Sequence, residues 1–541
     1  MGKLEKWESK FHGGPKEGGG DGATWAGVAQ GEGQAPDVGV SPIDELNARL
    51  LDNVRPLAWQ DPEPAPRYNL VVVGAGASGL VSAAGAAGVG GRVALIEESL
   101  LGGDCLNVGC VPSKALIRCA KAVHEVRCSE AFGVEIDGTV RANFGKVMQR
   151  MRRLRAQISK NDSAERFTSL GVDVFQGRAK FNGPESLEVN GKTLKFSAAV
   201  VATGGRAAVP PIKGLKDVPY LTNASLFNLT ELPPRLAVIG GGPIGMELAQ
   251  AMCRFGSEVT VLDIADRVLL KEERDAADIV LKQVEADGVK FKLPVGIQEV
   301  SRLESGEITM SLDYKGSAET LVVDAVLVAT GRVPNVEGMG LEVAGIKYDK
   351  RTGIEVNDFL QTTNKRVFAA GDVCTLYRFT HVGDSMARTV VRNALFFGRG
   401  KMSSLLIPWC TYTEPEIAHV GKYEHELDAA GVRYQKFRRD LADVDRAILD
   451  GADEGYVTVL TKEGSDQILG ATVVAADAGN MISEVTVAMQ AGMGLGALAS
   501  VIHPYPTQAE AIRQCGDQYN RTRLTPVVKT VFNAVLSLKR R

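Results

Sequence analysis

The feature that most constrains the fold of this chain is a pattern that occurs twice. In each copy an apolar run, typical of a buried strand, leads into three closely spaced glycines and then into a helical pattern. The copies occupy residues 69–79 and 236–245. Their glycines are Gly74, Gly76 and Gly79 in the first copy and Gly240, Gly242 and Gly245 in the second. Two strand–turn–helix units of one kind predict an α/β fold with two similar domains.

Each copy is followed by a second predicted strand that leads to an acidic residue, Glu97 in the first copy and Asp263 in the second. Both acids lie about 23 residues after the first glycine, close to the ~20 expected of a dinucleotide-binding fold. In that fold the glycine turn and the helix N-terminus receive a pyrophosphate, and the acid binds a ribose hydroxyl. Two copies with strand, helix and acid in register therefore predict two bound dinucleotides rather than two purely structural turns.

Two dinucleotides on one chain suggest that electrons pass from one cofactor to the other. The segment after Asp263 contains no arginine before Arg267. A nucleotide with a 2′-phosphate would favour an arginine in place of the acid, so the second copy is predicted to prefer NADH over NADPH.

Between the two copies, the segment GGDCLNVGCVPSK at residues 102–114 contains Cys105 and Cys110. Pro112 suits the first turn of a helix, which would place Cys110 at a helix N-terminus. The helix dipole there lowers the pKa of a thiol and favours the thiolate. Lys114 lies about one helical turn further on the same face. The segment therefore predicts a redox-active dithiol.

Composition disfavours several other classes of protein. The chain has 541 residues, of which 45% are hydrophobic and 23% charged, values typical of a globular protein. With 62 basic and 65 acidic residues the net charge is −3, so no nucleic-acid partner is predicted. The cysteines at 105–128 lack the spacings common in structural zinc and ferredoxin sites, so no resident metal is predicted. The chain does not open on a signal or transit peptide, and we expect a soluble, intracellular protein, located in the cytoplasm, with an organelle as the alternative.

Together these motifs resemble the pyridine nucleotide-disulfide oxidoreductases, a family that includes dihydrolipoyl dehydrogenase, glutathione reductase and, in closest likeness, mercuric reductase. The resemblance extends from about Tyr68 to Thr525, and CLNVGCVPSK is its most specific part. Further family motifs are two Ala-Thr-Gly segments and a segment that resembles the second FAD motif. Their cofactor-binding residues would be Gly204, Gly331, Gly371 and Asp372.

The resemblance implies two Rossmann-like dinucleotide-binding domains followed by a C-terminal α+β dimerisation domain, and hence a homodimer. The implied parts are a partly flexible N-terminal extension at 1–66, an FAD-binding domain at 67–216 and 346–406, an NAD(P)-binding domain at 217–345, a dimerisation domain at 407–525 and a basic tail at 526–541.

The resemblance also implies roles for single residues. The first glycine copy would bind FAD, and the second would bind NAD(P)H. Cys110 would contact the flavin, while Cys105 would be the exposed thiol that exchanges with substrate. Lys114 would pair with Glu247 close to the flavin, and Asp372 would bind the ribityl chain. The implied enzyme passes hydride equivalents from NAD(P)H through FAD and the dithiol to an acceptor.

The C-terminal part departs from the pattern of the disulfide reductases. There the partner subunit supplies a histidine as acid–base, and a glutamate five residues later orients it. Here Tyr505 stands at the histidine position, Glu510 at the glutamate position, and His503 two residues earlier. Tyrosine also occupies this place in mercuric reductases, but their C-terminal cysteine pair is missing, since Cys515 stands alone.

Three functions remain open. A soft metal ion or another non-disulfide acceptor fits Tyr505, whereas a dihydrolipoyl dehydrogenase or other small-disulfide reductase would use His503 as its base. The third is a flavin-bearing redox-sensing or membrane-docking protein that depends on the N-terminal segment and on the basic tail at 527–541. That tail is predicted to be a helix packed on the dimer, with a place on a membrane surface as the alternative.

Overall fold

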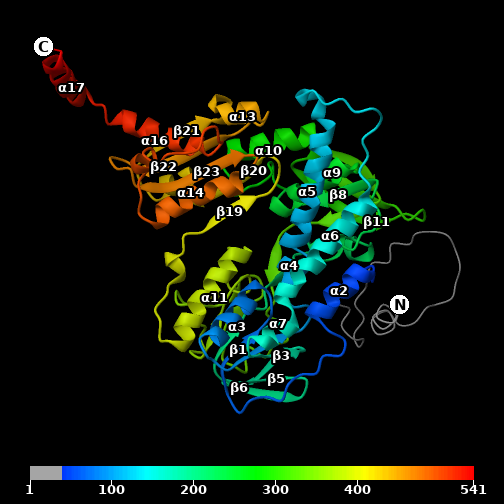
Figure 1. The fold of residues 1–541 in the computed structure, drawn as a ribbon. Coiled ribbons are helices and arrows are strands. Elements are labelled where there is room, and N and C mark those ends of the chain that lie inside the picture. The colour runs from blue at the N-terminus through cyan, green and yellow to red at the C-terminus, as the bar shows by residue number, and fades with distance from the viewer. Residues whose placement is uncertain (1–38, 541) are drawn as a thin grey trace. The chain divides into compact units, whose positions relative to one another are not determined.

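The computed structural model describes residues 39–540, so much of the predicted N-terminal extension lies outside the described residues. The described residues form two compact units, each made from two pieces of chain. The first unit comprises residues 39–267 and 288–405, and the second comprises residues 268–287 and 406–540. Figure 1 shows the elements of both units.

The first glycine pattern lies in a seven-stranded sheet of the first unit. β1 (Tyr68–Val73) is almost fully buried and pairs in parallel with β2 (Val93–Glu97) and with β6 (Lys192–Val201). β18 (Val367–Ala369) pairs in parallel with β6, which unites segments far apart in the sequence in one domain. The remaining strands are β3 (Val172–Gln176), β4 (Lys180–Gly183) and β5 (Ser186–Val189).

The second glycine pattern lies in a four-stranded parallel sheet with the order β10, β9, β8, β14. These strands are β8 (Arg235–Ile239), β9 (Glu258–Leu262), β10 (Lys290–Lys292) and β14 (Ala325–Val328). Between β10 and β14 the chain forms an antiparallel sheet of β11 (Val295–Arg302), β12 (Ile308–Tyr314) and β13 (Ser317–Val323). Both glycine patterns therefore form strand–turn–helix units, and the predicted pair of α/β domains is confirmed.

Helices follow both glycine loops, α3 (Ala77–Gly88) after the first and α9 (Pro243–Phe255) after the second. The other helices of the first unit are α2 (Glu45–Val54), α4 (Gly103–Asn107), α5 (Cys110–Arg127), α6 (Phe144–Ile158), α7 (Ala164–Ser169), α8 (Asn223–Leu226) and α11 (Thr380–Leu395). Its short strands are β7 (Gly205–Ala207), β15 (Arg332–Pro334), β16 (Tyr348–Asp349) and β17 (Gly353–Ile354).

Residues shortly before β1 belong to the folded unit. The side chain of Asp44 accepts a hydrogen bond from the backbone N of Asn47 and caps α2. Arg155 of α6 is buried and donates to Asn47 Oδ1 at 2.8 Å, and Arg152 pairs with Asp44 at 2.7 Å. This part of the predicted extension is therefore packed against the first unit.

The second unit is built on a five-stranded antiparallel sheet with the order β19, β20, β23, β22, β21. These strands are β19 (Pro408–Thr411), β20 (Glu416–Gly421), β21 (Tyr434–Asp440), β22 (Tyr456–Lys462) and β23 (Ile468–Ala475). Its helices are α10 (Arg274–Ala286), α12 (Glu424–Ala429), α13 (Asp445–Leu449), α14 (Ala478–Gln490), α15 (Leu495–Leu498), α16 (Glu510–Thr522) and α17 (Pro526–Lys539). This arrangement agrees with the predicted α+β domain. Among residues 39–540, none of the helices combines the length and the apolar character needed to cross a membrane.

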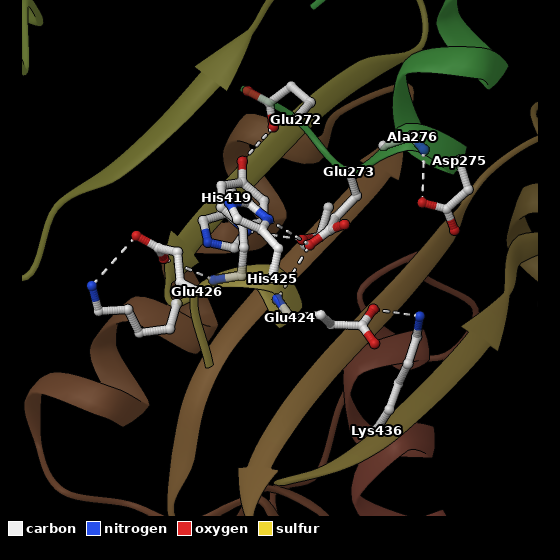
Figure 2. Close-up of polar contacts among 12 residues, drawn as sticks. Glu272, Glu273, Asp275, Ala276, His419, Glu424, His425, Glu426 and Lys436 are labelled. Atoms are coloured by element: carbon white, nitrogen blue, oxygen red, sulfur yellow. Dashed lines mark hydrogen bonds and ion pairs between the residues drawn. The ribbon is translucent and has the colours of Figure 1, made fainter. Parts of the chain in front are cut away.

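The residues just before α10 bind the rest of the second unit through the carboxylates of Glu272, which is buried, and Glu273, which is half-buried, as Figure 2 shows. The Tyr423 hydroxyl donates a hydrogen bond to Glu272 Oε2 at 2.5 Å, and Trp409 Nε1 donates to Oε1 at 3.1 Å. Glu273 Oε1 accepts from the backbone N of Glu424 at 3.2 Å. Burial raises the pKa of Glu272 above its usual value. These contacts explain why the segment 268–287 forms part of the second unit although it follows β9 in the sequence.

Candidate redox site

The outer glycines of both loops are required by the packing of the protein itself. A Cβ on Gly74 would lie 2.5 Å from the carbonyl O of Ala202, and one on Gly79 would lie 1.8 Å from that of Gly74. In the second copy a Cβ on Gly240 would lie 2.6 Å from the carbonyl O of Ala329, and one on Gly245 would lie 1.9 Å from that of Gly240. The two loops are therefore built in the same way, each closed against the exit of a neighbouring strand.

The middle glycines have no such role inside the protein. Gly76 and Gly242 have φ angles of −75° and −77°, which any residue can adopt. A Cβ on Gly242 would meet nothing within 4 Å, and one on Gly76 would come no closer than 3.8 Å, to Gly103. Both glycines cap a helix, α3 or α9, without a side-chain hydrogen bond to its first turn. Because no side chain lies at these positions, a pyrophosphate can come close to the backbone amides of the helix N-terminus. Both loops therefore fit a dinucleotide.

The two predicted acids bond to the loops. Glu97 Oε2 accepts a hydrogen bond from the backbone N of Ala75 at 2.6 Å, and Asp263 Oδ2 accepts one from Gly241 at 2.6 Å. The other carboxylate oxygen accepts from the backbone N of Ser99 in the first copy, at 2.8 Å, and of Ala265 in the second, at 2.9 Å. Each oxygen retains a second lone pair, so the carboxylates can hold the loop and still accept a ribose hydroxyl. The ribose contact itself stays a prediction.

The two cysteines lie in consecutive helices beside the first glycine loop. Cys105 lies in the middle of the short helix α4, and Cys110 is the first residue of α5. A Cβ on Gly103, which begins α4, would lie 2.7 Å from the Cα of Gly76. The segment with the cysteines therefore packs directly on the loop that fits a pyrophosphate.

The pair is present as two thiols, and their environments separate their pKa values. A hydrogen bond from Cys105 lowers the pKa of Cys110 to about 6, with further contributions from Thr380 and Lys114. The same bond, together with burial, raises the pKa of Cys105. Cys110 is therefore the thiolate of the pair, and Cys105 keeps the proton. Cys105 is half-buried and Cys110 exposed, and the predicted role of Cys105 as the thiol that exchanges with substrate stays a prediction.

Sequence reasoning missed Thr380, whose Oγ1 lies 3.4 Å from Cys110 Sγ. Thr380 is the first residue of α11, so the N-termini of two helices meet at the Cys110 thiol. Both helix dipoles favour an anion there. Since 270 residues separate the two side chains in the sequence, no local motif could have indicated the contact.

The predicted pair of Lys114 and Glu247 is present in the structure. Lys114 Nζ lies 2.9 Å from Glu247 Oε2 and joins α5 to α9. The Glu247 side chain is only 7% exposed, which excludes a merely solvated helix residue. The place of this pair beside a flavin stays a prediction.

The residues predicted to bind the ribityl chain, Gly371 and Asp372, follow shortly after β18. Gly371 has a φ of +81°, and a Cβ there would lie 2.5 Å from Ser78 Oγ in α3. Burial raises the pKa of Asp372, and the nearby Arg332 opposes this rise. Arg332 also pairs with Asp104, next to Cys105. Sequence reasoning missed this arginine, which connects the two motifs.

Two further glycines predicted to bind cofactor, Gly204 and Gly331, follow β6 and β14, which lie in different sheets of the first unit. Their φ angles are +64° and +122°, and nothing lies within 4 Å of a Cβ on either. Glycine is thus required there by the backbone turn rather than by a close neighbour.

The predicted acid–base residues lie in the second unit and have other partners than expected. His503 Nε2 lies 2.7 Å from Glu484 Oε1, and the imidazole is only 6% exposed. Tyr505 is 70% exposed, and its hydroxyl donates to Asp445 at 2.7 Å.

Glu510 pairs with Arg513, one turn further along α16, at 2.6 Å. No hydrogen bond among residues 39–540 joins it to His503 or Tyr505, and its predicted orienting role stays a prediction. Within residues 39–540, no group of three or more His, Cys, Asp and Glu side chains could hold a metal ion.

Comparison with known proteins agrees with this geometry. Residues 68–388 match the family described as pyridine nucleotide-disulphide oxidoreductase, and residues 407–515 match the dimerisation domain of that family. A mercuric reductase from Staphylococcus aureus is 31% identical over 447 residues, which cover 82% of this chain and 81% of that protein. A dihydrolipoyl dehydrogenase from Thermus scotoductus is 33% identical over 472 residues, 84% of this chain and 98% of that protein.

Among solved structures, the Cu(II) complex of the HOCl-induced flavoprotein disulfide reductase RclA from Escherichia coli is similar, with a TM-score of 0.74 and 28% identity. The likeness covers 82% of this chain and 98% of that chain.

Proposed function

Because the chain belongs to the pyridine nucleotide-disulphide oxidoreductase family, we propose that it is the enzyme that reduces a soft, thiophilic metal ion through its Cys105–Cys110 dithiol. The family implies FAD and NAD(P)H as cofactors, and the match to the dimerisation domain supports a homodimer. The observation that carries the proposal is the lowered pKa of Cys110, which makes one sulfur a thiolate at neutral pH. Thiolates are the ligands that soft metal ions prefer.

When bound, FAD and NAD(P)H would supply the hydride and electron transfer that reduces the cysteine pair. The residues of the chain bind the cofactors and control the protons. The backbone at Gly76 and at Gly242 would receive the two pyrophosphates. Cys105 Sγ holds the proton of the dithiol, while Lys114 and Thr380 stabilise the charge on Cys110 Sγ.

A metal acceptor fits this chain better than a disulfide because of the side chains at the predicted acid–base position. Reduction of a disulfide releases a thiolate that needs a proton. A metal ion instead displaces the proton of Cys105 to solvent as both sulfurs bind it, and its reduction takes up no proton. The hydrogen bond to Asp445 raises the pKa of Tyr505, which makes this phenol a still weaker acid. The mercuric reductase relatives and the Cu(II) complex of RclA support the same class of acceptor.

A small disulfide, such as that of a lipoyl group, is the second candidate acceptor. The specific observation in its favour is the His503–Glu484 pair at 2.7 Å, since a carboxylate-oriented imidazole can transfer a proton near neutral pH. The dihydrolipoyl dehydrogenase relatives support it.

We also propose that NADH is preferred over NADPH. Asp263 directly follows β9 beside the second loop, where its carboxylate would accept a ribose hydroxyl and repel a 2′-phosphate. Asp263→Asn should therefore lower KM for NADPH, with a smaller effect on KM for NADH.

The acceptor is tested with an anaerobic panel of Hg(II), Cu(II), lipoamide, glutathione disulfide and a quinone, each with NADH and with NADPH. We expect nucleotide oxidation that depends on Hg(II) or Cu(II), that is lost in Cys105→Ser and Cys110→Ser, and that persists in Cys119→Ser. Cys119 is the matched control because it is a half-buried thiol further along α5. Turnover of a disulfide alone, abolished by His503→Gln, would support the second candidate and refute the first.

A further inference from the structure

The last helix, α17 (Pro526–Lys539), has no buried residue. Every other described helix of ten or more residues buries part of one face. The local sequence explains why α17 forms without packing. Thr525 caps it by accepting a hydrogen bond from the backbone N of Val528, and Pro526 occupies the first helical position.

At helical spacing the side chains of α17 divide into two faces, with the exception of Lys539 in the last turn, which falls within the apolar arc. The apolar side chains cover more than half of the circumference at 100° per residue, and six large ones are 46–73% exposed. They are Val527, Val531, Phe532, Val535, Leu536 and Leu538. The opposite face carries Lys529, Thr530, Asn533, Ser537 and Arg540. Such a large exposed apolar face is rarely left in water.

The charge of the C-terminal segment identifies what covers that face. After Asp517 the sequence contains no acidic residue. Its bases are Arg521, Arg523, Lys529, Lys539, Arg540 and Arg541. An apolar face edged by bases alone is complementary to a bilayer with anionic headgroups. The tail of a second copy would bring like charges together instead.

The length of α17 determines how it can lie. Fourteen residues at ~1.5 Å each make a helix of about 21 Å, shorter than the ~30 Å hydrocarbon core of a bilayer. The helix can therefore lie in the plane of the interface but cannot cross the membrane. The match to the dimerisation domain ends at residue 515, so this helix lies outside the matched family domains.

We propose that α17 docks the enzyme on an anionic lipid surface, with its apolar face inserted between headgroups and its bases bound to lipid phosphates. The test is co-sedimentation of the full-length protein with vesicles of phosphatidylcholine, with or without phosphatidylglycerol. We expect strong binding only when phosphatidylglycerol is present, and weaker binding as salt is added.

Three variants separate the contributions of the two faces. The double variant Phe532→Ser with Leu536→Ser should lower the partition coefficient at least ~100-fold, because two large apolar side chains no longer insert. The matched control, Thr530→Ser with Ser537→Thr on the polar face, should bind like wild type. Lys529→Gln should weaken binding about fivefold. Oxidation of NAD(P)H with a soluble acceptor should be unchanged in all of them.

The oligomeric state is measured on the same variants by light scattering. Vesicle binding by wild type, with an unchanged oligomer in the double variant, supports the proposal. Absence of wild-type binding to anionic vesicles overturns it. Equal binding with and without phosphatidylglycerol also overturns it, as does dissociation of the oligomer by the double variant, since α17 would then cover a second copy.

Discussion

Thr380→Val should raise the pKa of Cys110 by about one unit, because it removes a hydroxyl 3.4 Å from the thiolate and keeps the shape of the side chain. A hydrogen bond to a charged group contributes ~1.5–3 kcal/mol. Sulfur is a weak hydrogen-bond acceptor and the contact is long, so we take the lower end of that range. At ~1.4 kcal/mol per unit this gives a rise of about one pKa unit. The value of about 6 in the wild type should therefore become about 7.

The pKa of Cys110 can be measured in two independent ways. The first is the pH dependence of the rate at which iodoacetamide alkylates Cys110 in the reduced protein, with the modified peptide identified by mass spectrometry. The second is the long-wavelength thiolate–flavin absorbance after addition of two electrons per subunit, followed from low to high pH. The absorbance should appear as Cys110 loses its proton and should be absent in Cys110→Ser. The pH at which it reaches half of its full value, its midpoint, should be higher in Thr380→Val than in the wild type.

Thr389→Val is the matched control for this experiment. Thr389 lies in the same helix, is buried, and donates its hydroxyl hydrogen bond to the Ser385 carbonyl at 3.0 Å rather than to a cysteine. Its substitution should leave the midpoint unchanged. An unchanged midpoint in Thr380→Val, or an equal rise in both variants, would refute the role that we assign to the Thr380 hydroxyl.

Three further predictions follow from contacts elsewhere in the chain. Glu247→Gln should lower the pKa of Cys110, the opposite sign from Thr380→Val, because Glu247 is a negative charge that raises it; the alkylation profile measures this. Gly245→Ala should unfold or severely destabilise the protein, since its Cβ would lie 1.9 Å from a carbonyl O. Gly242→Ala should instead fold normally and lose affinity for NADH. Thermal unfolding and titration with the nucleotide distinguish the two variants. Burial raises the pKa of Glu272 in the folded protein, so the folded state favours the protonated carboxyl group. The stability that protonated Glu272 contributes is complete at pH values below the pKa of Glu272 in the unfolded chain. It is lost as the pH rises through the pKa of Glu272 in the folded protein. The Glu272→Gln side chain stays neutral, so this variant should lack the fall in Tm with rising pH that ionisation of Glu272 causes. The same dependence of Tm on pH in the variant and the wild type would contradict this role of Glu272.

The parts of the site that could be predicted from the sequence are those in which neighbouring residues determine the geometry. The spacing of Gly74, Gly76 and Gly79 requires a particular strand-to-helix turn, because a side chain at the outer positions would overlap the backbone. The second loop repeats the same restraint. The start of α5 at Cys110 likewise follows from Pro112, two residues further on.

The charge distribution around the cysteines depended on residues that only the tertiary structure brings together. Thr380 reaches Cys110 across 270 residues, and Arg332 reaches Asp104 across 228. The partners of His503 and Tyr505 are Glu484 and Asp445, neither of which belongs to the motif that contains them. Such partners cannot be read from spacing, because a hydrogen bond or ion pair depends on which distant elements pack together.

The sequence by itself therefore determined the two nucleotide loops, the dithiol and the α/β fold, since each follows from backbone geometry over a few residues. Only the tertiary structure decided which cysteine carries the charge, which carboxylates hold the predicted acid–base residues, and that α17 stays unburied. The pairing of β18 with β6 and the packing of α11 against α3 place those distant groups. The electrostatic field at a thiol is the sum over all groups that the fold brings near it.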